Sequence, residues 1–471
     1  MAELFDPLFT AAEMRAAEEE HPNYPASISE LMERAGKSVA AAVDDRYPDA
    51  RRITVVAGSG SNGGDGRVAA GLLQANREVL VVDVRPEDDP KELGDPDVVI
   101  DAIFGTGFTG EPRPGAARLI QQVNRLGRPV VAVDIPSGVD ASTGEIAGAA
   151  INADLTVTFH GPKVGLHVAP GRFRAGDIVV ADIGLQGGET ANALVRGEIL
   201  KLVPAKREGD NKYTAGAVLV VGGSRGLTGA ACLAARAAFR ADAGYVAVAA
   251  PVSSLTILET QLVEVVKRPV AEDWQGRMTE EAAGSVVEAA ERMRAVALGP
   301  GLGRSDSTVE LVRRLLAALN VPLVVDADAL SNLEPFARTA PTILTPHESE
   351  LGRLLGEPSG WVAAHRLEAL RRAVDRYACI VLLKGADTLI GAPGERPLVV
   401  SGNVPALAAA GTGDVLTGII AAFLAKGVEP RLAAAAGAVV HRRAARAAGR
   451  PRGLVAGDVV EALPDALDAP I

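Results

Sequence analysis

Aromatic residues are scarce in this chain, and positive charge is not in excess. Aromatic residues make up only 3% of the 471 residues, which argues against a protein that stacks nucleic-acid bases on an aromatic platform. Lys and Arg number 48 against 59 Asp and Glu, a net charge of -11, so most of the surface repels a phosphate backbone. We therefore expect no nucleic-acid partner, and any anionic ligand must bind at a local site.

Cysteine, histidine and long apolar runs are also rare. Cys232 and Cys379 lie in apolar stretches, so we expect them to act as small buried hydrophobic side chains. From this we infer a reducing compartment. The six histidines show no metal-ligand spacing. The acidic N-terminal segment lacks the basic start and apolar core of a secretory signal, and no run reaches the roughly 18 apolar residues of a membrane helix. We expect a cytoplasmic protein without a membrane partner.

The pattern of the chain predicts an α/β fold. From about residue 51, short β-rich apolar runs alternate with Ala-rich helical stretches, as in βαβ units around a mostly parallel sheet. This rhythm restarts after a Gly- and charge-rich stretch, so we expect one domain over residues 1–205 and another over 206–471. A helix is expected over 229–241, and the last long helix near Gly413. Strands are expected at 52–57, 78–83, 97–100, 129–134, 217–221, 295–298, 322–325, 342–344 and 379–383.

A glycine-rich loop follows the first predicted strand of this pattern. Gly58, Gly60 and Gly63 satisfy G-x-G-x-x-G between a strand and a helix, where bare backbone N–H groups can approach a phosphate. Asp83 ends the next strand about 20 residues later, where a dinucleotide-binding fold has its ribose-binding carboxylate. The loop alone leaves open an NAD-dependent dehydrogenase or a tight turn with no ligand.

The loops that follow resemble those of another family, the NAD(P)HX epimerases. Leu31–Gly36 is followed by NGGDG from Asn62, DAIFGTG from Asp101, DIPSG from Asp134 and TFHGPK ending at Lys163, in the family's order. The resemblance spans about residues 10–185 and implies a Rossmann-like three-layer αβα domain. One departure is Ser61, where the family usually has a second Asn. In this family the enzyme interconverts the R and S epimers of NADH or NADPH hydrated at C6 of the nicotinamide ring.

The resemblance also implies site residues in the first half. Asp134 is expected to contact the hydrated ring and to move a proton while a bond at C6 opens, with Lys163 as its partner. The plainer alternative is that Asp134 only caps the turn at Pro136. The expected substrate-binding residues are Ser61, Asn62, Gly63, Gly64, Asp65, Gly105, Thr106, Gly107, Phe108, Thr109, Gly110 and Glu111.

Three oxygen-bearing side chains at neighbouring strand ends form a candidate cation site. Asn62, Asp101 and Ser137 supply an amide, a carboxylate and a hydroxyl. One formal negative charge suits a monovalent cation better than Mg²⁺ or Zn²⁺. The family resemblance implies K⁺ at this epimerase site. Alternatively, the three residues only form hydrogen bonds within turns.

A second glycine loop opens a helix in the second half. Gly411-Thr-Gly413-Asp414 presents backbone N–H groups that can neutralise a transferred phosphoryl group, and Asp414 can take the proton of an attacking hydroxyl. The P-loop pattern G-x-x-x-x-G-K-[ST] does not occur. By itself this loop could be only a tight turn.

The other loops of this half resemble the ADP- or ATP-dependent NAD(P)HX dehydratases, a ribokinase-like α/β family. The motifs are GPGLG from Gly299, DADAL from Asp326, TPHE from Thr345, KGADT from Lys384 and then GTGD, within about residues 205–471. NKYTAG from Asn211 departs from the family's common His-Lys-Gly. The resemblance implies that Asp414, Ala230, Gly301 and His347 face the hydrated coenzyme, although His347 could be structural. The nucleotide, ADP or ATP with Mg²⁺, is expected at Lys384, Gly385, Ala386, Asp387, Thr388 and Gly413.

The two halves together suggest a bifunctional repair enzyme for NADHX and NADPHX. Phosphorylation of the C6 hydroxyl makes a good leaving group, so the S epimer can be dehydrated to NAD(P)H, while an epimerase supplies S from R. Three alternatives remain: a ribokinase-like small-molecule kinase fused to a nucleotide-binding domain, a dehydrogenase, and a non-enzymatic binding protein. A homo-oligomer of undefined size is expected.

Overall fold

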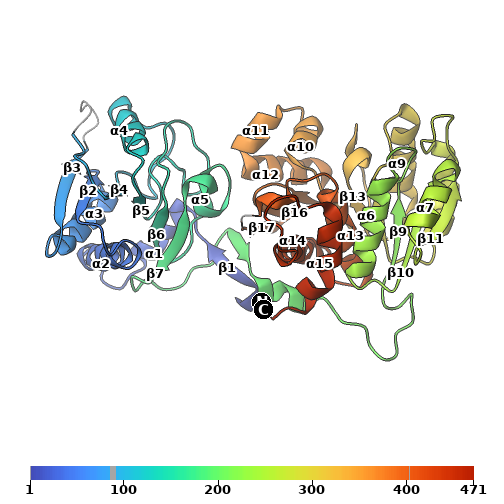
Figure 1. Ribbon diagram of the computed structural model, residues 1–471, viewed down its shortest axis with the longest axis horizontal. Helices are drawn as coiled ribbons and strands as arrows, with labels where there is room; N and C mark the ends of the chain where they lie inside the picture. The colour runs from blue at the N-terminus through green and yellow to red at the C-terminus, as the bar shows by residue number, and fades with distance from the viewer. Residues whose placement is uncertain (1, 85–91, 403, 471) are drawn as a thin grey trace. The chain divides into compact units, whose positions relative to one another are not determined.

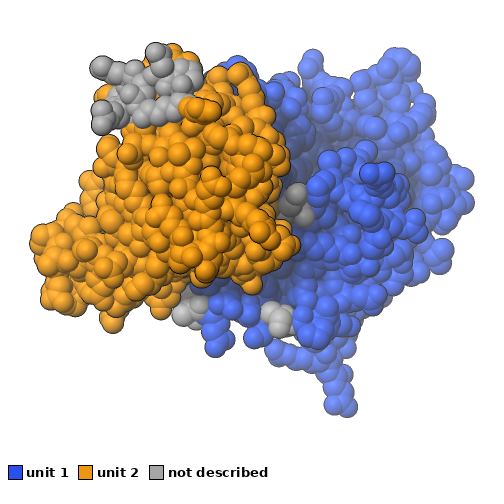
Figure 2. Space-filling model, turned by 60° about the vertical axis from the view of Figure 1, so that its left-hand side comes forward, with its two compact units in different colours: residues 1–6, 194–362, 367–471 blue, residues 7–193, 363–366 orange. Residues whose placement is uncertain are grey.

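The computed structural model describes residues 2–84, 92–402 and 404–470 and divides into two compact units (Figure 2). The N-terminal unit comprises residues 7–193 and 363–366. The C-terminal unit comprises residues 1–6, 194–362 and 367–471. The division falls before the predicted boundary near residue 205. The strand β8 (Asn192–Val195) is hydrogen-bonded to β17 (Glu395–Val400). The 3-10 helix η3 (Gly197–Leu202) packs on α14 (Pro430–Ala447), so most of this segment belongs to the C-terminal unit.

The N-terminal unit is built on a six-stranded parallel sheet of order β3-β2-β4-β5-β6-β7. The strands predicted at 52–57 and 78–83 are confirmed at those bounds, and the next two are confirmed with shifted ends. The bounds are β2 (Arg52–Ala57), β3 (Glu78–Asp83), β4 (Val98–Ala102), β5 (Val130–Val133), β6 (Leu155–Phe159) and β7 (Asp177–Ala181).

Helices cover both faces of this sheet (Figure 1). On one face, α2 and α3 pack against each other and against β2, β4 and β6. On the other face, Leu119, Ile120 and Val123 of α4 join Val99 and Val130 of the sheet in a second core. The expected three-layer αβα arrangement is therefore present. The helices are α1 (Ala11–Glu19), α2 (Ile28–Arg46), α3 (Ser61–Leu73), α4 (Pro114–Arg125) and the short α5 (Val164–His167).

The C-terminal unit contains most of a larger sheet, of order β1-β8-β17-β16-β15-β14-β13-β12-β9-β10-β11. The strands from β15 through β11 pair in parallel, and β15, β16 and β17 pair antiparallel. Their bounds are β1 (Phe5–Leu8), β9 (Ala217–Val221), β10 (Tyr245–Pro251), β11 (Val266–Val270), β12 (Ala295–Leu298), β13 (Leu323–Val325), β14 (Thr342–Leu344), β15 (Ile380–Leu383) and β16 (Thr388–Ala392).

The helices of this unit begin with the predicted Ala-rich helix, here α6 (Thr228–Arg240), which packs against α13 (Thr412–Ala425). Helix α13 starts where expected, but it is not the last long helix: α14 follows with Pro430 at its first turn, and then α15 (Ala456–Asp468). The others are α7 (Leu255–Gln261), α8 (Ala283–Ala290), α9 (Asp306–Ala318), α10 (Glu348–Leu355), α11 (Ser359–Ala364) and α12 (Arg366–Tyr377).

The structure also bears on the two cysteines and on membrane-spanning helices. Cys232 and Cys379 are free thiols but only partly buried, so full burial was wrong. Both lie near the ends of their elements, Cys232 in the second turn of α6 and Cys379 just before β15. No helix in the described part of the chain is both long and apolar enough to span a membrane.

Candidate active sites

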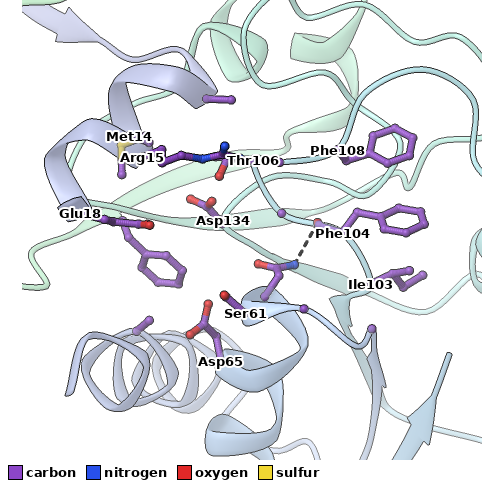
Figure 3. Close-up of a pocket in the computed structure, with 18 of the residues that line it drawn as sticks. Met14, Arg15, Glu18, Ser61, Asp65, Ile103, Phe104, Thr106, Phe108 and Asp134 are labelled. Atoms are coloured by element: carbon purple, nitrogen blue, oxygen red, sulfur yellow. Dashed lines mark hydrogen bonds between the residues drawn. The ribbon is translucent and has the colours of Figure 1, made fainter. Parts of the chain in front are cut away.

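The N-terminal unit contains a pocket of about 990 Å³ at the carboxyl ends of its strands, within the size range of small-molecule sites. It is walled by the loops after β2, β4 and β5 and by α1 and α2 (Figure 3). Parallel strands gather their following loops at one edge, so the position agrees with the general rule for open α/β sheets. We refer to it as the N-terminal pocket.

Steric constraints explain the glycines that open this pocket. A Cβ on Gly58 would lie 2.1 Å from the carbonyl oxygen of Ile103, and a Cβ on Gly63 would lie 1.9 Å from that of Gly58. Helix α3 begins at Ser61, and its N-cap, Gly60, has no side chain to bond the first-turn N–H groups. Those N–H groups have no intrahelical acceptor, so this helix end suits an anion.

The loop after β4 forms the facing wall of the pocket. The rings of Phe104 and Phe108 stack with centroids 4.6 Å apart, and Asn62 Nδ2 donates to the carbonyl oxygen of Phe104 at 2.9 Å. Gly63, Gly64 and Gly110 are not among the lining residues; Gly63 supports the turn, and a Cβ on Gly64 would meet Met32 of α2. The predicted substrate-binding residues that do line it are Ser61, Asn62, Asp65, Gly105, Thr106, Gly107, Phe108, Thr109 and Glu111.

Asp134 lines the same pocket directly after β5. Its backbone has a φ of 65°, a left-handed conformation that is rare outside glycine. Its Oδ1 lies 2.7 Å from Nζ of Lys163, a side chain with no exposed surface, and accepts a hydrogen bond from Thr158 Oγ1 at 3.1 Å. The predicted pairing of Asp134 with Lys163 is therefore present in the geometry. A backbone held this way is typical of functional positions.

Helix α1 supplies pocket residues that the sequence reasoning missed. Met14, Arg15 and Glu18 all line the pocket. The helix begins with a capping box in which Thr10 and Glu13 bond each other's backbone N–H groups, a signal that was visible in the sequence. Burial and the charge of Asp134 raise the pKa of Glu18. The site thus has a third wall from a segment far from the motif loops.

The dehydrogenase alternative required Asp83 at the ligand. Instead, Asp83 is not a lining residue, and its side chain, 59% exposed, is paired with Arg67 at 2.5 Å. The carboxylate that this alternative assigns to a ribose is therefore outside the N-terminal pocket.

Asp101 and Ser137 lie behind the pocket wall, both buried. Asp101 accepts hydrogen bonds from the backbone N–H and the hydroxyl of Ser137, at 2.8 and 2.7 Å. Burial raises the pKa of Asp101 to about 6, although these bonds oppose the shift. Across the described ranges, no group of three or more His, Cys, Asp or Glu side chains is placed to hold a metal ion. A single buried carboxylate beside neutral oxygens fits a monovalent cation better than a divalent one.

In the C-terminal unit, the first turn of α13 presents Asp414. The N-cap, Gly411, has a φ of 87°, and a Cβ on Gly413 would lie 3.3 Å from Nζ of Lys384. Burial and the charge of Asp326 raise the pKa of Asp414 to about 7, while Lys384 lowers it. A carboxylate, an ammonium and first-turn N–H groups thus meet at one helix end, an arrangement that suits phosphoryl chemistry.

Asp326 organises this site, and the sequence reasoning gave it no role. It follows β13, is buried, and its two oxygens contact Lys384 Nζ at 2.7 Å and Thr417 Oγ1 of α13 at 2.6 Å. Burial alone would raise the pKa of Asp326, but Lys384 outweighs it and the pKa is lowered. This contact joins the strand ends of β13 and β15 to α13.

The remaining predicted residues occupy neighbouring loops. A Cβ on Gly301 would lie 2.3 Å from the carbonyl oxygen of Leu227, which also accepts a hydrogen bond from the N–H of Ala230, so these two predicted residues are close. His347 caps α10 through Nδ1, which accepts from the N–H of Ser349 at 3.1 Å, and its ring is half exposed. The structural role considered for His347 is therefore present; this does not exclude ligand contact.

The loop from Lys384 to Thr388 is held from behind by α14. Arg442 donates to the carbonyl oxygen of Ala386 at 2.9 Å and to Thr388 Oγ1 at 3.2 Å, and also bonds Gly402. Asp387 in the same loop is buried. Arg442 thus holds the backbone at Ala386 and the side chain of Thr388, and Lys384 at the start of the loop lies beside Gly413.

Comparison with known proteins agrees with this division. A family described as YjeF-related protein N-terminus matches residues 28–93 and 79–165, and one described as NAD(P)H-hydrate dehydratase matches residues 218–464. Proteins described as bifunctional NAD(P)H-hydrate repair enzyme Nnr match nearly the whole chain. That of Moorella thermoacetica is 38% identical, covering 97% of this chain and 96% of its own length, and that of Pyrobaculum aerophilum is 36% identical, covering 92% and 93%.

A solved structure matches the C-terminal unit. It is an ADP/ATP-dependent NAD(P)H-hydrate dehydratase from Bacillus subtilis, co-crystallised with ATP and Mg²⁺. It is 27% identical with a TM-score of 0.52 and covers 57% of this chain and 96% of its own. A ribokinase-like superfamily protein from Enterococcus faecalis, 24% identical with a TM-score of 0.52, covers 60% of this chain and 97% of its own. The α/β fold class and the ribokinase-like fold expected for the second half are confirmed.

Proposed function

The chain belongs to the family of bifunctional NAD(P)H-hydrate repair enzymes, and we propose that Asp134 and Asp414 perform the proton transfers of its two reactions. It epimerises hydrated NADH and NADPH and dehydrates them to the reduced coenzymes. The observation that best supports the assignment of residues is that each assigned carboxylate has a buried or nearly buried lysine near it: Lys163 lies 2.7 Å from Asp134, and Lys384, beside Gly413 at the start of α13, lowers the pKa of Asp414.

Epimerisation belongs to the N-terminal pocket. The first-turn N–H groups of α3 and the loop 105–111 bind the phosphates of the dinucleotide, and Asp134 contacts the hydrated ring. Lys163 compensates the negative charge of Asp134 and, with Thr158, fixes Oδ1. The second oxygen of Asp134 is then the one that accepts a proton from the reacting centre.

Potassium would occupy the position behind this wall. Asp101 would supply the charge and Asn62 and Ser137 neutral oxygens, and the cation would compensate a buried carboxylate that otherwise has only hydrogen bonds. The cation would fix the loop after β4, because Ser137 Oγ also accepts from the N–H of Phe104. Its contribution is therefore to the shape of the pocket.

Dehydration belongs to the end of α13. Hydroxide is a poor leaving group and phosphate a good one, so transfer of a phosphoryl group to the C6 hydroxyl of the S epimer allows elimination to the reduced coenzyme. Asp414 accepts the hydroxyl proton, and a base with a pKa of about 7 suits that task. The nucleotide, ADP or ATP, binds along Lys384 to Thr388 and Gly413; Mg²⁺ bound to it would neutralise its phosphate charge.

The test uses the full chain and a mixture of R- and S-NADHX. Recovery of the near-ultraviolet absorbance of NADH is followed with ADP or ATP and without either. We expect complete recovery with nucleotide, because R is converted to S, and none without. Recovery that stops at the initial S fraction would contradict the epimerase assignment, and phosphorylation of an unrelated alcohol without NADH recovery would favour the small-molecule kinase.

A further inference from the structure

One pocket residue combines burial with the lack of a partner. Asp65, in the second turn of α3, lines the N-terminal pocket but is only 9% exposed. Within the ranges that the structure describes, its carboxyl group has neither a hydrogen bond nor an ion pair. Burying an unpaired carboxylate is costly, so such a group is favoured in its neutral form.

Asp65 and Asp134 differ in their surroundings. Asp134 has an ammonium 2.7 Å away, whereas the two charges that act on Asp65 are those of carboxylates, Asp134 and Glu18. Burial and the negative charges of Asp134 and Glu18 raise the pKa of Asp65 to about 8, so it holds a proton at neutral pH. Figure 3 shows Asp65 rising from α3 on one side of the pocket and Asp134 lying at the strand end on the other. A buried carboxyl group without a partner opposite a carboxylate that is paired with an ammonium is an arrangement typical of an acid and a base.

We propose that Asp65 is the acid–base partner of Asp134 in the epimerisation, and that the two act on opposite faces of the hydrated nicotinamide ring. This inference rests on the proposed function of the N-terminal pocket. It assigns Asp65 a chemical role beyond contact with the substrate.

The reaction proceeds by cleavage of the C6–O bond. Asp65 donates its proton to the departing hydroxyl, which leaves as water with the bonding electron pair, while the lone pair of ring N1 forms a C6=N1 double bond. A water molecule then adds to C6 on the opposite face and gives its proton to Asp134. C6 is inverted, one water has left and one has added, and a proton has passed from Asp65 to Asp134. The other epimer reacts with the two roles exchanged, as microscopic reversibility requires.

The charged residues that line the pocket set the protonation of Asp65. Glu18 of α1 is one of them and is more exposed than Asp65. Helix α2, which packs on α3, lines the pocket with uncharged side chains, among them Leu31, Met32 and Ala35. The other charged lining residues are Arg15, Glu19, Glu111, Arg113 and Asp134, of which Asp134 is paired with Lys163. Asp83, by contrast, is exposed and lies outside the pocket, so D83N is a matched control.

The experiment compares D65N with D83N in the full-length protein, measuring R/S interconversion of NADHX by NMR exchange. We expect D65N to lower kcat by about 100-fold or more with little change in KM, since acid–base groups contribute about 10²–10⁴. D83N makes the same substitution in the same unit, at an exposed side chain outside the pocket, and should retain the rate within about twofold. Thermal unfolding of D65N, followed by circular dichroism, should match that of the unaltered protein, because dehydration of S-NADHX reports only on the C-terminal unit. D65N with an unaltered kcat, or D83N with the larger loss, would overturn the proposal.

The pH profile and the oxygen label give two further readouts. In the unaltered protein, kcat for interconversion should fall as pH rises above about 8, because the proton of Asp65 is then lost, and the residual rate of D65N should lack this decline. In water labelled with heavy oxygen, each inversion should incorporate the label at C6. Inversion without label would mean ring opening at the C–N bond and would overturn the proposed step. If the unaltered protein shows no epimerisation at all, the proposed function fails instead.

Discussion

Asp134 directly follows a strand of the parallel sheet and Asp414 lies in the first turn of α13, and the two carboxylates differ in how a lysine acts on them. Lys163 lies 2.7 Å from Asp134 itself, whereas Lys384 lies 2.7 Å from Asp326 and only influences Asp414. The pair in the N-terminal unit compensates the charge of the reacting carboxylate directly. In the C-terminal unit the same chemical pair stabilises the scaffold, and Asp414 is left with a pKa near neutrality. One lysine therefore contacts the proposed catalytic group itself, and the other contacts a neighbouring carboxylate.

The largest effect is expected for D414N. The amide cannot accept the hydroxyl proton, so nucleotide-dependent dehydration of S-NADHX should fall by about 10²–10⁴-fold. Interconversion of R and S, measured on the same preparation, should stay within twofold. Dehydration within tenfold of the unaltered protein would show that another group is the base.

The corresponding change in the other unit is D134N, measured as R/S interconversion. A loss of about 100-fold is expected, because the amide keeps the shape but not the basicity. The matched control is T158V, which removes the 3.1 Å hydrogen bond to Oδ1 and keeps the carboxylate, and should cost less than tenfold. Because Lys163 is fully buried and loses its charge partner in D134N, thermal unfolding must accompany the assay. A loss in T158V as large as in D134N would make positioning the main contribution.

The pH dependence should separate the two reactions. The proposed role of Asp414 as the base requires its deprotonated form, so kcat/KM for dehydration should rise with pH up to about 7 and fall about tenfold per unit below it. Lys384 lowers the pKa of Asp414, so K384M should move this rise to higher pH. Epimerisation should show no rise of this origin. An unmoved midpoint in K384M would contradict the influence of Lys384.

Removing potassium should slow epimerisation, by a smaller factor than the substitutions above. Exchange of K⁺ for tetramethylammonium should slow epimerisation by a few-fold, because the cation supports the pocket wall rather than the reacting atoms. D101N should slow the reaction and abolish the response to K⁺, since the buried charge is gone. If D101N responds like the unaltered protein, Asn62, Asp101 and Ser137 form only structural hydrogen bonds.

The smallest effect concerns the boundary between the halves. The fragment 206–471 lacks β8, which pairs with β17, and η3, which packs on α14, whereas the fragment 192–471 keeps both. We expect both to dehydrate S-NADHX. The shorter fragment should unfold several degrees lower, since a loss of 1–2 kcal/mol shifts the midpoint by roughly 2–8 °C in domains of this size. Equal midpoints would support the boundary near 205.

The sequence predicted the strand ends well because each is marked by an apolar run meeting a polar or glycine-rich loop. Asp134, Asp414 and the loops around them could be found for the same reason. Asp326 could not be given its role, because its contact with Lys384 spans 58 residues and depends on β13 and β15 lying on either side of β14. The pKa values of Glu18 and Asp65 are raised by burial and by the charge of Asp134, and these effects depend on how α1 and α3 pack.

The space around each glycine of the N-terminal pocket shows which positions can be substituted. Gly58 and Gly63 have backbone oxygens within 2.1 Å of any added Cβ, so a library at these positions would yield mostly unfolded chains. Gly60 and Gly107 line the same pocket, have nothing within 4 Å of an added Cβ and do not have positive φ angles. Directed evolution toward other hydrated pyridine nucleotides should therefore diversify residues 60 and 107 first.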